Sequence, residues 1–154
     1  MLSNIGISLV FLILILSLLI IAAAVFDLKT PEQFIKKKIY KLSLFQTSFT
    51  ILCFFTLIIG FINSDFSLIN VYENSHTTKP FFYKIAGTWG NHEGSLLLWV
   101  IILVIFSYLF LVFNHAHNKK FRLYTLIFQN VLILGFLFFL LLNSNPFNSI
   151  YPIP

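Results

Sequence analysis

Four long runs of this sequence contain no Lys, Arg, Asp or Glu. They are residues 5–26, 42–62, 96–113 and 123–142. A helix of about 20 residues crosses the roughly 30 Å of hydrocarbon in a bilayer. Because backbone polar groups in lipid must pair within their own segment, each run is predicted to form a helix. The sequence therefore predicts an all-α integral membrane protein, with four transmembrane helices in a single membrane domain over residues 1–154.

The composition supports a membrane protein. Hydrophobic residues make up 58% of the chain, charged residues only 10%, and 20 of the 154 residues are Phe. That is more apolar surface than a soluble domain can bury. The first run contains the small residues Ala22 and Ala24, but it begins without a basic stretch and continues to Phe26, which excludes a secretory signal peptide. An Arg-rich transit peptide is excluded too, because Arg122 is the only arginine.

The basic residues predict the orientation of the helices. Eight of the ten Lys and Arg residues fall in segments 27–41 and 114–122, which by the positive-inside rule face the cytoplasm or matrix. Both termini, the outer tail 143–154 and the segment 63–95 are then expected in the periplasm or intermembrane space. We call residues 63–95 the outer loop. The net charge of +5 follows from this topology and does not indicate nucleic-acid binding.

The outer loop contains an apolar stripe. Phe81, Phe82, Ile85, Ala86 and Trp89 recur at the spacing of one helical turn, which predicts a short helix lying in the headgroup region. Two interpretations remain open. The stripe is either an aromatic anchor at the membrane surface, which is the commoner case, or a platform that contacts a ligand.

The end of the outer loop is expected to bend sharply into the third transmembrane helix. Gly87, Gly90 and Gly94 predict a tight turn. Glu93 and Ser95 lie where a carboxylate or hydroxyl caps the first turn of a helix.

The histidines and the single cysteine do not form a complete active site. His92 at an interface can ligate haem iron or shuttle protons, although a hydrogen-bonded structural role is commoner. His115 and His117 diverge on a helix and cannot share a metal ion, and His76 lies in a polar turn. Cys53 is alone and is predicted to act as a small hydrophobe. We predict no catalytic residue and no metal site, and the absence of charge in the four runs disfavours a transporter.

Several stretches of the chain match one family in order. They are residues 63–71, 74–75, 82–85, 89–99 and 143–147. They resemble the N-terminal part of the CcmF family, the membrane subunit of the cytochrome c haem lyase in the CcmF/CcmC haem-handling superfamily. The family motif Trp-Gly-Gly-His-Glu-Gly has Asn91 in place of its second glycine here. Asn tolerates unusual backbone dihedrals only partly, and the loop shape is expected to be kept.

The resemblance implies a role in System I cytochrome c maturation. The lyase of that system takes haem from the chaperone CcmE and joins it to the two thiols of a CxxCH motif in apocytochrome c, with a CcmH-type thiol subunit. The family's axial histidines and tryptophan-rich WWD segment have no counterpart here. A split or truncated form is therefore expected, with haem shared with or held by a partner chain that carries those features. The outer haem-handling surface is expected to contain Trp89, His92, Glu93 and Trp99.

Two further expectations follow from the sequence. Nine Lys against one Arg, with heavy use of Phe, Ile and Asn, indicate AT-rich coding, which favours the mitochondrial inner membrane over a bacterial plasma membrane. The alternative function is a structural subunit of a respiratory-chain complex, with the Phe-rich helices packed against that complex.

Overall fold

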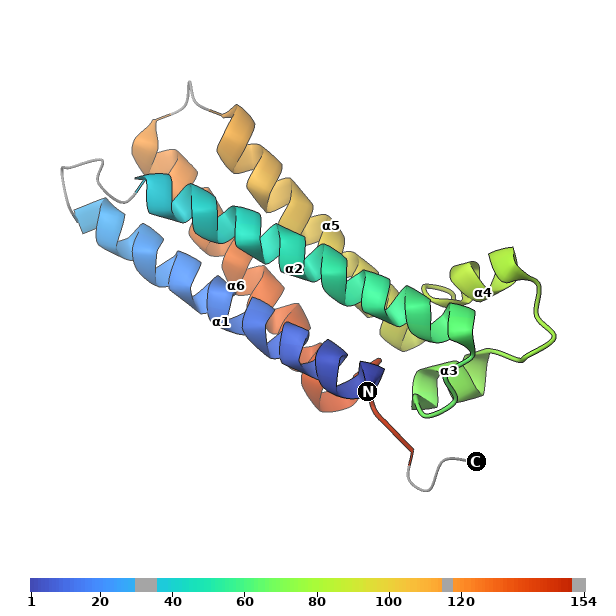
Figure 1. Cartoon of the computed structure of the whole chain (residues 1–154). Coiled ribbons are helices and arrows are strands. Elements are labelled where there is room, and N and C mark those ends of the chain that lie inside the picture. The colour runs from blue at the N-terminus through green and yellow to red at the C-terminus, as the bar shows by residue number, and fades with distance from the viewer. Residues whose placement is uncertain (30–35, 115–117, 151–154) are drawn as a thin grey trace.

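The computed structural model describes residues 1–29, 36–114 and 118–150. Four long helices lie side by side, and two short ones sit at one end of this bundle (Figure 1). The long helices are α1 (Leu2–Lys29), α2 (Lys36–Asn63), α5 (His92–Phe113) and α6 (Lys119–Asn143). The short helices are α3 (Ile69–Asn74) and α4 (Phe81–Gly87). His115 and His117 lie outside the described residues.

All four long helices are long and apolar enough to cross a membrane. The prediction of an all-α protein with four candidate transmembrane helices is therefore confirmed. The N-terminus, α3, α4 and the end of the described tail lie at one end of the bundle, which we call the outer end (Figure 1). The lysine-rich helix ends lie at the opposite end, which we call the basic end.

The helices continue beyond the charge-free runs. Helix α1 extends through Asp27, which is only 3% exposed. The Nζ atom of Lys119 at the start of α6 lies 3.1 Å from Asp27 Oδ1. A carboxylate thus belongs to a long helix after all, and it is tolerated because it lies at the helix end with a cation beside it.

Buried Arg122 joins three helices at the basic end. Its Nη2 donates to Tyr40 Oη at 2.6 Å and to the carbonyl of Leu111 at 2.8 Å. Tyr40 Oη donates to the same carbonyl at 2.8 Å. Leu111 lies in the last turn of α5, where carbonyls lack helical partners and the helix dipole is negative. The guanidinium group therefore stabilises the end of α5 while linking it to α2 and α6.

A second polar contact lies within the bundle core. Gln46 Nε2 donates to Ser17 Oγ at 2.7 Å and to Asn130 Oδ1 at 3.1 Å. All three side chains are fully buried. Ser17 and Asn130 in turn donate to the carbonyls of Ile13 and Leu126. This network joins α1, α2 and α6, in the way that polar side chains link helices in membranes.

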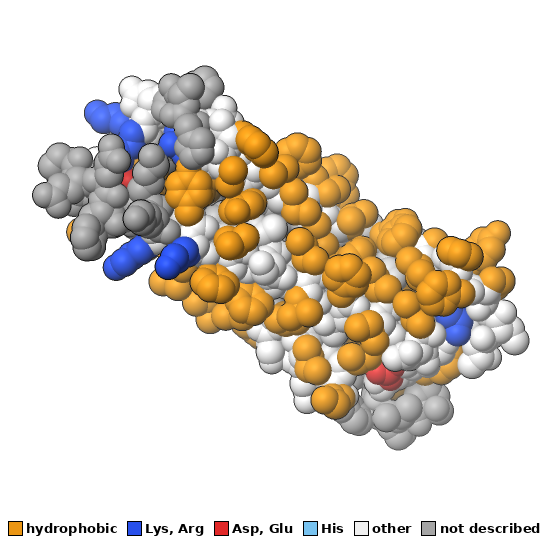
Figure 2. Space-filling model, turned by 45° about the horizontal axis from the view of Figure 1, so that its top comes forward, with side chains coloured by type: hydrophobic (Ala, Val, Ile, Leu, Met, Phe, Trp, Pro, Cys, Tyr) orange, Lys and Arg blue, Asp and Glu red, His pale blue; other side chains and the backbone are white. Residues whose placement is uncertain are grey.

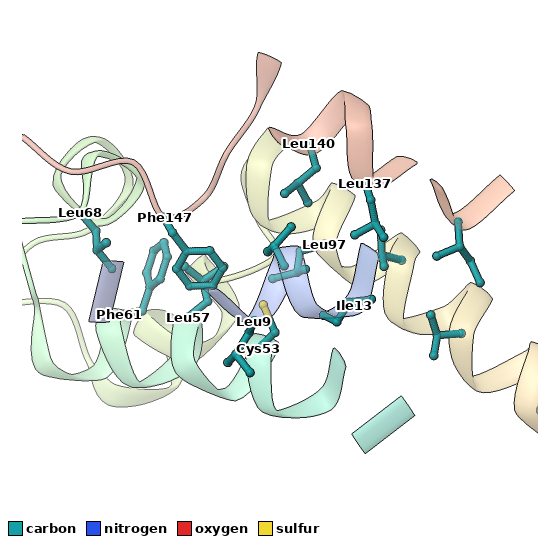
Figure 3. Packing of buried hydrophobic residues seen from close by; sticks show 14 of the residues in the cluster. Leu9, Ile13, Cys53, Leu57, Phe61, Leu68, Leu97, Leu137, Leu140 and Phe147 are labelled. Carbon is teal, nitrogen blue, oxygen red and sulfur yellow. The ribbon is translucent and has the colours of Figure 1, made fainter. Parts of the chain in front are cut away.

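The tail after α6 returns to the outer end and closes the core. Phe147 is fully buried and belongs to the same hydrophobic cluster as Phe61 (Figure 3). Ser3 Oγ donates to the Phe147 carbonyl at 2.7 Å. An isolated antiparallel bridge joins Leu68 to Ser149, with hydrogen bonds of 2.9 Å on either side. The tail is therefore part of the packed outer end. Cys53 packs into the same cluster as a small buried hydrophobe, as expected.

Gly6 should be required for the tail to pack. A Cβ atom built on Gly6 would lie 2.1 Å from Cδ1 of Phe147, so Gly6→Ala forces the buried ring out of place. We expect a loss of about 1–3 kcal/mol in unfolding free energy, the usual cost of overpacking. Thermal unfolding in detergent, followed by circular dichroism, measures the effect.

Gly135→Ala is the matched control. A Cβ atom there meets nothing within 4 Å, and Ala stabilises a helix interior by roughly 1 kcal/mol relative to Gly. Equal melting temperatures for the two variants would contradict the packing of Phe147 on Gly6.

Candidate functional site

Asn91 builds the turn between α4 and α5. Its backbone is extended, with φ −121° and ψ 170°. Its side-chain Oδ1 accepts from the backbone N–H of Gly94 at 2.7 Å, and its Nδ2 donates to the Gly87 carbonyl at 2.8 Å. The second bond reaches the last residue of α4, while the first satisfies an amide in the first turn of α5.

This geometry corrects the predicted caps. Asn91 is the N-cap of α5, and neither Glu93 nor Ser95 takes that role. The reason is that α5 begins at His92, about one turn before the charge-free run, so both residues lie inside the helix. Ser95 Oγ donates to the His92 carbonyl at 2.9 Å. Glu93 lies in the first turn, where its carboxylate complements the positive end of the helix dipole.

The glycines of the turn serve close packing. No glycine among the described residues has a positive φ angle. A Cβ atom on Gly94 would lie only 1.6 Å from the Thr88 carbonyl oxygen. The predicted turn is present at residues 88–91, and its glycines do not supply left-handed backbone there. Gly94 is needed because α5 passes directly over the Thr88 carbonyl, and the extended backbone of Asn91 is one that any residue adopts.

His92 lies exposed at the start of α5 beside an aromatic ring of α6. The ring centroids of His92 and Phe139 are 6.4 Å apart, with planes at 85°. His92 and Trp99 are seven residues apart on one helix, which places them on the same face, about 10 Å apart along the axis. Trp99 is 57% exposed and Phe139 44% exposed. We call His92, Trp99 and Phe139 the His92 face.

The two other predicted surface residues are placed differently. Trp89 is 42% exposed and lies in the turn before α5. Glu93 is one residue beyond His92, so it points about 100° around the helix and is partly buried. The structure therefore brings His92 and Trp99 onto one face of α5, while Glu93 points about 100° away and Trp89 lies in the turn before the helix. Phe139 was missed by sequence reasoning, because only the packing of α5 against α6 brings it there.

The predicted short helix of the outer loop exists as α4, but it ends at Gly87, before Trp89. Three consecutive aromatic side chains of α4 are exposed: Phe81 by 54%, Phe82 by 79% and Tyr83 by 68%. Lys84 Nζ donates to Ser64 Oγ at 2.6 Å and ties α4 to the end of α2. Since large exposed apolar patches mark contacts with membrane or protein, α4 presents a second apolar surface at the outer end.

His76 lies on a separate cleft of about 420 Å³, which is also lined by Phe66, Tyr72 and Ser75. The Phe66 and Tyr72 rings meet edge to face, with centroids 6.5 Å apart. Sequence reasoning did not find this cleft, because helix α3, which carries Tyr72, was not predicted. Among the described residues, no three His, Cys, Asp or Glu side chains are grouped to hold a metal ion.

The turn should be sensitive to Asn91 and Gly94. We expect Asn91→Ala to cost about 1 kcal/mol of unfolding free energy through loss of the helix cap. Gly94→Ala should cost more, because the Thr88 carbonyl is backbone and cannot rotate away. Thermal unfolding and limited proteolysis of the outer loop measure both effects. Gly135→Ala is again the control, since a Cβ atom there meets nothing within 4 Å, and an equal loss in that variant would contradict the packing of Gly94.

The chain is similar in sequence to cytochrome c-type biogenesis proteins. No family model matches the chain. The chain is 46% identical over 101 residues to the cytochrome c-type biogenesis protein CycK of Rhizobium meliloti, covering 66% of this chain and 15% of that protein. It is 47% identical over 105 residues to the cytochrome c-type biogenesis protein ccl1 of Rhodobacter capsulatus, covering 68% and 16%.

The fold agrees with the sequence comparison. A solved structure titled cytochrome c haem lyase CcmF matches 99% of this chain with a TM-score of 0.87, at 20% identity, over 26% of its own length. The chain spans about one sixth of the length of the curated relatives named above. By sequence and by fold, the chain is therefore a relative of part of the CcmF-type cytochrome c biogenesis proteins.

Proposed function

We propose that this chain is a subunit of a cytochrome c haem lyase, equivalent to the N-terminal part of CcmF, and that it works with a chain supplying the rest. The observation that carries the proposal is the His92 face, where an exposed imidazole, an exposed indole and a phenyl ring lie together at the outer end. Two of its three residues, His92 and Trp99, fall within the stretch 89–99 that most resembles the family. The comparisons give no support to the alternative of a respiratory-complex scaffold.

The residues of the His92 face fit contact with a haem edge better than enclosure of haem. His92 offers one imidazole nitrogen, and Trp99 and Phe139 offer apolar ring surface. Among the described residues this face carries no second histidine, so the histidines that hold the haem iron would come from a partner chain. When bound, haem supplies the vinyl groups that react with the thiols of apocytochrome c. This chain's contribution is to orient that group, and Trp89 and Glu93 are proposed to contribute to the same outer surface.

The proposed partners follow from this role. They are the remaining CcmF chain or chains with the WWD segment and axial histidines, the haem chaperone CcmE, a CcmH-type thiol subunit, and apocytochrome c. Exposed rings on the long helices, such as Phe106 at 63% and Phe128 at 66%, give the partner chain apolar surface to pack against. In this proposal, lyase activity belongs to the complex that this chain forms with its partner chains.

The membrane and the orientation are also part of the proposal. The Lys-rich composition supports the mitochondrial inner membrane, while the relatives named above are bacterial and fit the alternative of a bacterial plasma membrane. The outer end would face the intermembrane space or periplasm, with the exposed rings of α4 in the headgroup region. The concentration of lysines at the basic end supports this orientation.

His92→Ala tests the lyase role. We expect covalently attached cytochrome c to fall at least about tenfold. Loss of a contact that positions the haem should raise the activation free energy of attachment by about 1.4 kcal/mol or more, which corresponds to that factor in rate. Respiratory complexes that lack cytochrome c should still assemble. Haem-stained gels of membrane fractions and native gels measure the two outcomes.

His76→Ala is the matched control, because His76 is also an exposed histidine at the outer end but lies on the other cleft. Normal cytochrome c in His92→Ala, together with failed assembly of a respiratory complex, would favour the scaffold role. A purified complex without a partner chain and without a haem absorption band would also contradict the lyase assignment.

The orientation can be tested by labelling. Cys53 is fully buried and should not react, so a single added cysteine reports its own side of the membrane. We expect an impermeant maleimide added from the intermembrane space or periplasm to label Thr77→Cys and not Lys38→Cys. The opposite pattern would place the outer end on the wrong side for contact with apocytochrome c.

A further inference from the structure

Among the described residues, basic side chains outnumber acidic ones at the basic end of the bundle. Described basic side chains there come from three helices. They are Lys29, Lys38, Lys41, Lys119, Lys120 and Arg122. Asp27 is the one carboxylate that the described residues place there, and it is buried beside Lys119. Arg122 is also buried and donates to Tyr40 and Leu111. The exposed charge therefore belongs to lysines.

Three of these lysines share one arrangement. Each is exposed, and each has an exposed aromatic ring one helical turn nearer the middle of the bundle. The pairs are Lys29 with Phe26, Lys41 with Phe45, and Lys120 with Tyr124. The three rings are 58%, 53% and 61% exposed, in that order. Residues three or four apart lie on the same face of a helix. We call these six side chains the basic collar.

In all three pairs the ring lies deeper in the bundle than its lysine, because of the direction in which each helix runs. Helix α1 reaches the basic end at its C-terminus, so Phe26 lies deeper than Lys29. Helices α2 and α6 begin at the basic end, so Phe45 and Tyr124 also lie deeper than their lysines. Figure 2 shows one face of the molecule, with several blue side chains at one end, orange side chains along the length of the bundle, and a blue and a red patch near the other end.

We infer that the basic collar is a docking surface for anionic phospholipids of the adjacent leaflet. The ammonium groups are placed to contact lipid phosphates, while the rings one turn deeper contact the glycerol region and the upper acyl chains. Clusters of four to eight Lys or Arg beside a membrane helix attract anionic lipid, with about 1 kcal/mol for each basic residue. Charge complementarity therefore selects a lipid with a net negative headgroup.

A diacyl lipid fits the collar better than a free anion does. A soluble phosphate would neutralise the lysines but would offer no apolar surface to the exposed parts of the three rings. An anionic phospholipid satisfies both parts of each pair at once. The repetition of the pair on α1, α2 and α6 indicates a ring of lipid contacts around this end, which does not depend on the proposed lyase role.

Electron paramagnetic resonance with spin-labelled lipids tests the inference. The whole chain is reconstituted in phosphatidylcholine bilayers with labelled phosphatidylglycerol or labelled phosphatidylcholine. We expect phosphatidylglycerol to associate about fivefold more strongly, the factor that corresponds to the contribution of one lysine. The triple variant Lys29→Gln, Lys41→Gln, Lys120→Gln should bring this ratio close to one, and added salt should lower it in the unmodified chain.

Two controls separate the collar from other causes. The triple variant Lys29→Arg, Lys41→Arg, Lys120→Arg keeps the charge and should keep the preference. Lys79→Gln with Lys84→Gln removes the two lysines of the outer end and should leave it unchanged. If the triple glutamine variant fails to fold by circular dichroism, Lys120→Gln alone replaces it and should lower the ratio in part.

Three results would overturn the inference. The first is an unmodified chain that shows no preference for phosphatidylglycerol. The second is a folded glutamine variant that keeps the full preference. The third is loss of the preference on adding inorganic phosphate at an ionic strength where chloride has no effect, which would identify a site for free phosphate.

Discussion

The outer end of the molecule depends on the side chain of Asn91. Its carboxamide bonds to the last residue of α4 and to the first turn of α5, so one group sets the angle between the outer loop and a long helix. The absence of a side chain on Gly94 lets α5 pass close over Thr88. Together these contacts determine where α5 begins, and therefore where His92 and Trp99 are displayed.

The bilayer explains how the rest of the bundle uses its polar residues. Polar groups at lipid depth are costly unless they are paired. Gln46 binds Ser17 and Asn130 across three helices, and Arg122 stabilises a helix end with Tyr40. The apolar faces that remain exposed are the surfaces available to lipid and to other helices. Polar side chains thus specify the arrangement inside the bundle, and apolar ones mediate its contacts outside.

The four long helices could be predicted from the sequence, because charge-free runs of this length have one stable structure in lipid. Their ends could not. Asp27 continues α1 because Lys119 pairs with it, and α5 starts at His92 because Asn91 caps it. Both depend on partners or cap geometry that hydropathy does not report. The resemblance to the CcmF family was also recognisable from the sequence, since it rests on the residues of the outer loop.

The candidate site was only partly predictable. Trp89, His92, Glu93 and Trp99 were expected to form one surface, but helical geometry separates Glu93 from His92 and Trp99. Phe139 enters the site through the packing of α5 on α6. The burial of Phe147 against Gly6 joins residues near the two ends of the sequence. No local pattern indicates such contacts, because they exist only once the helices and the tail have packed.

The Gln46 network has a consequence for biosynthesis. Its partners lie on α1 and α6, so a chain that emerges from the ribosome in sequence order supplies Ser17 early and Asn130 only with the last helix. Until then, the Gln46 carboxamide has half of its final bonds in an apolar surrounding. Both bonds are present only after α6 has packed. We therefore expect the bundle to close late, when α6 assembles against α1 and α2 after its insertion into the membrane.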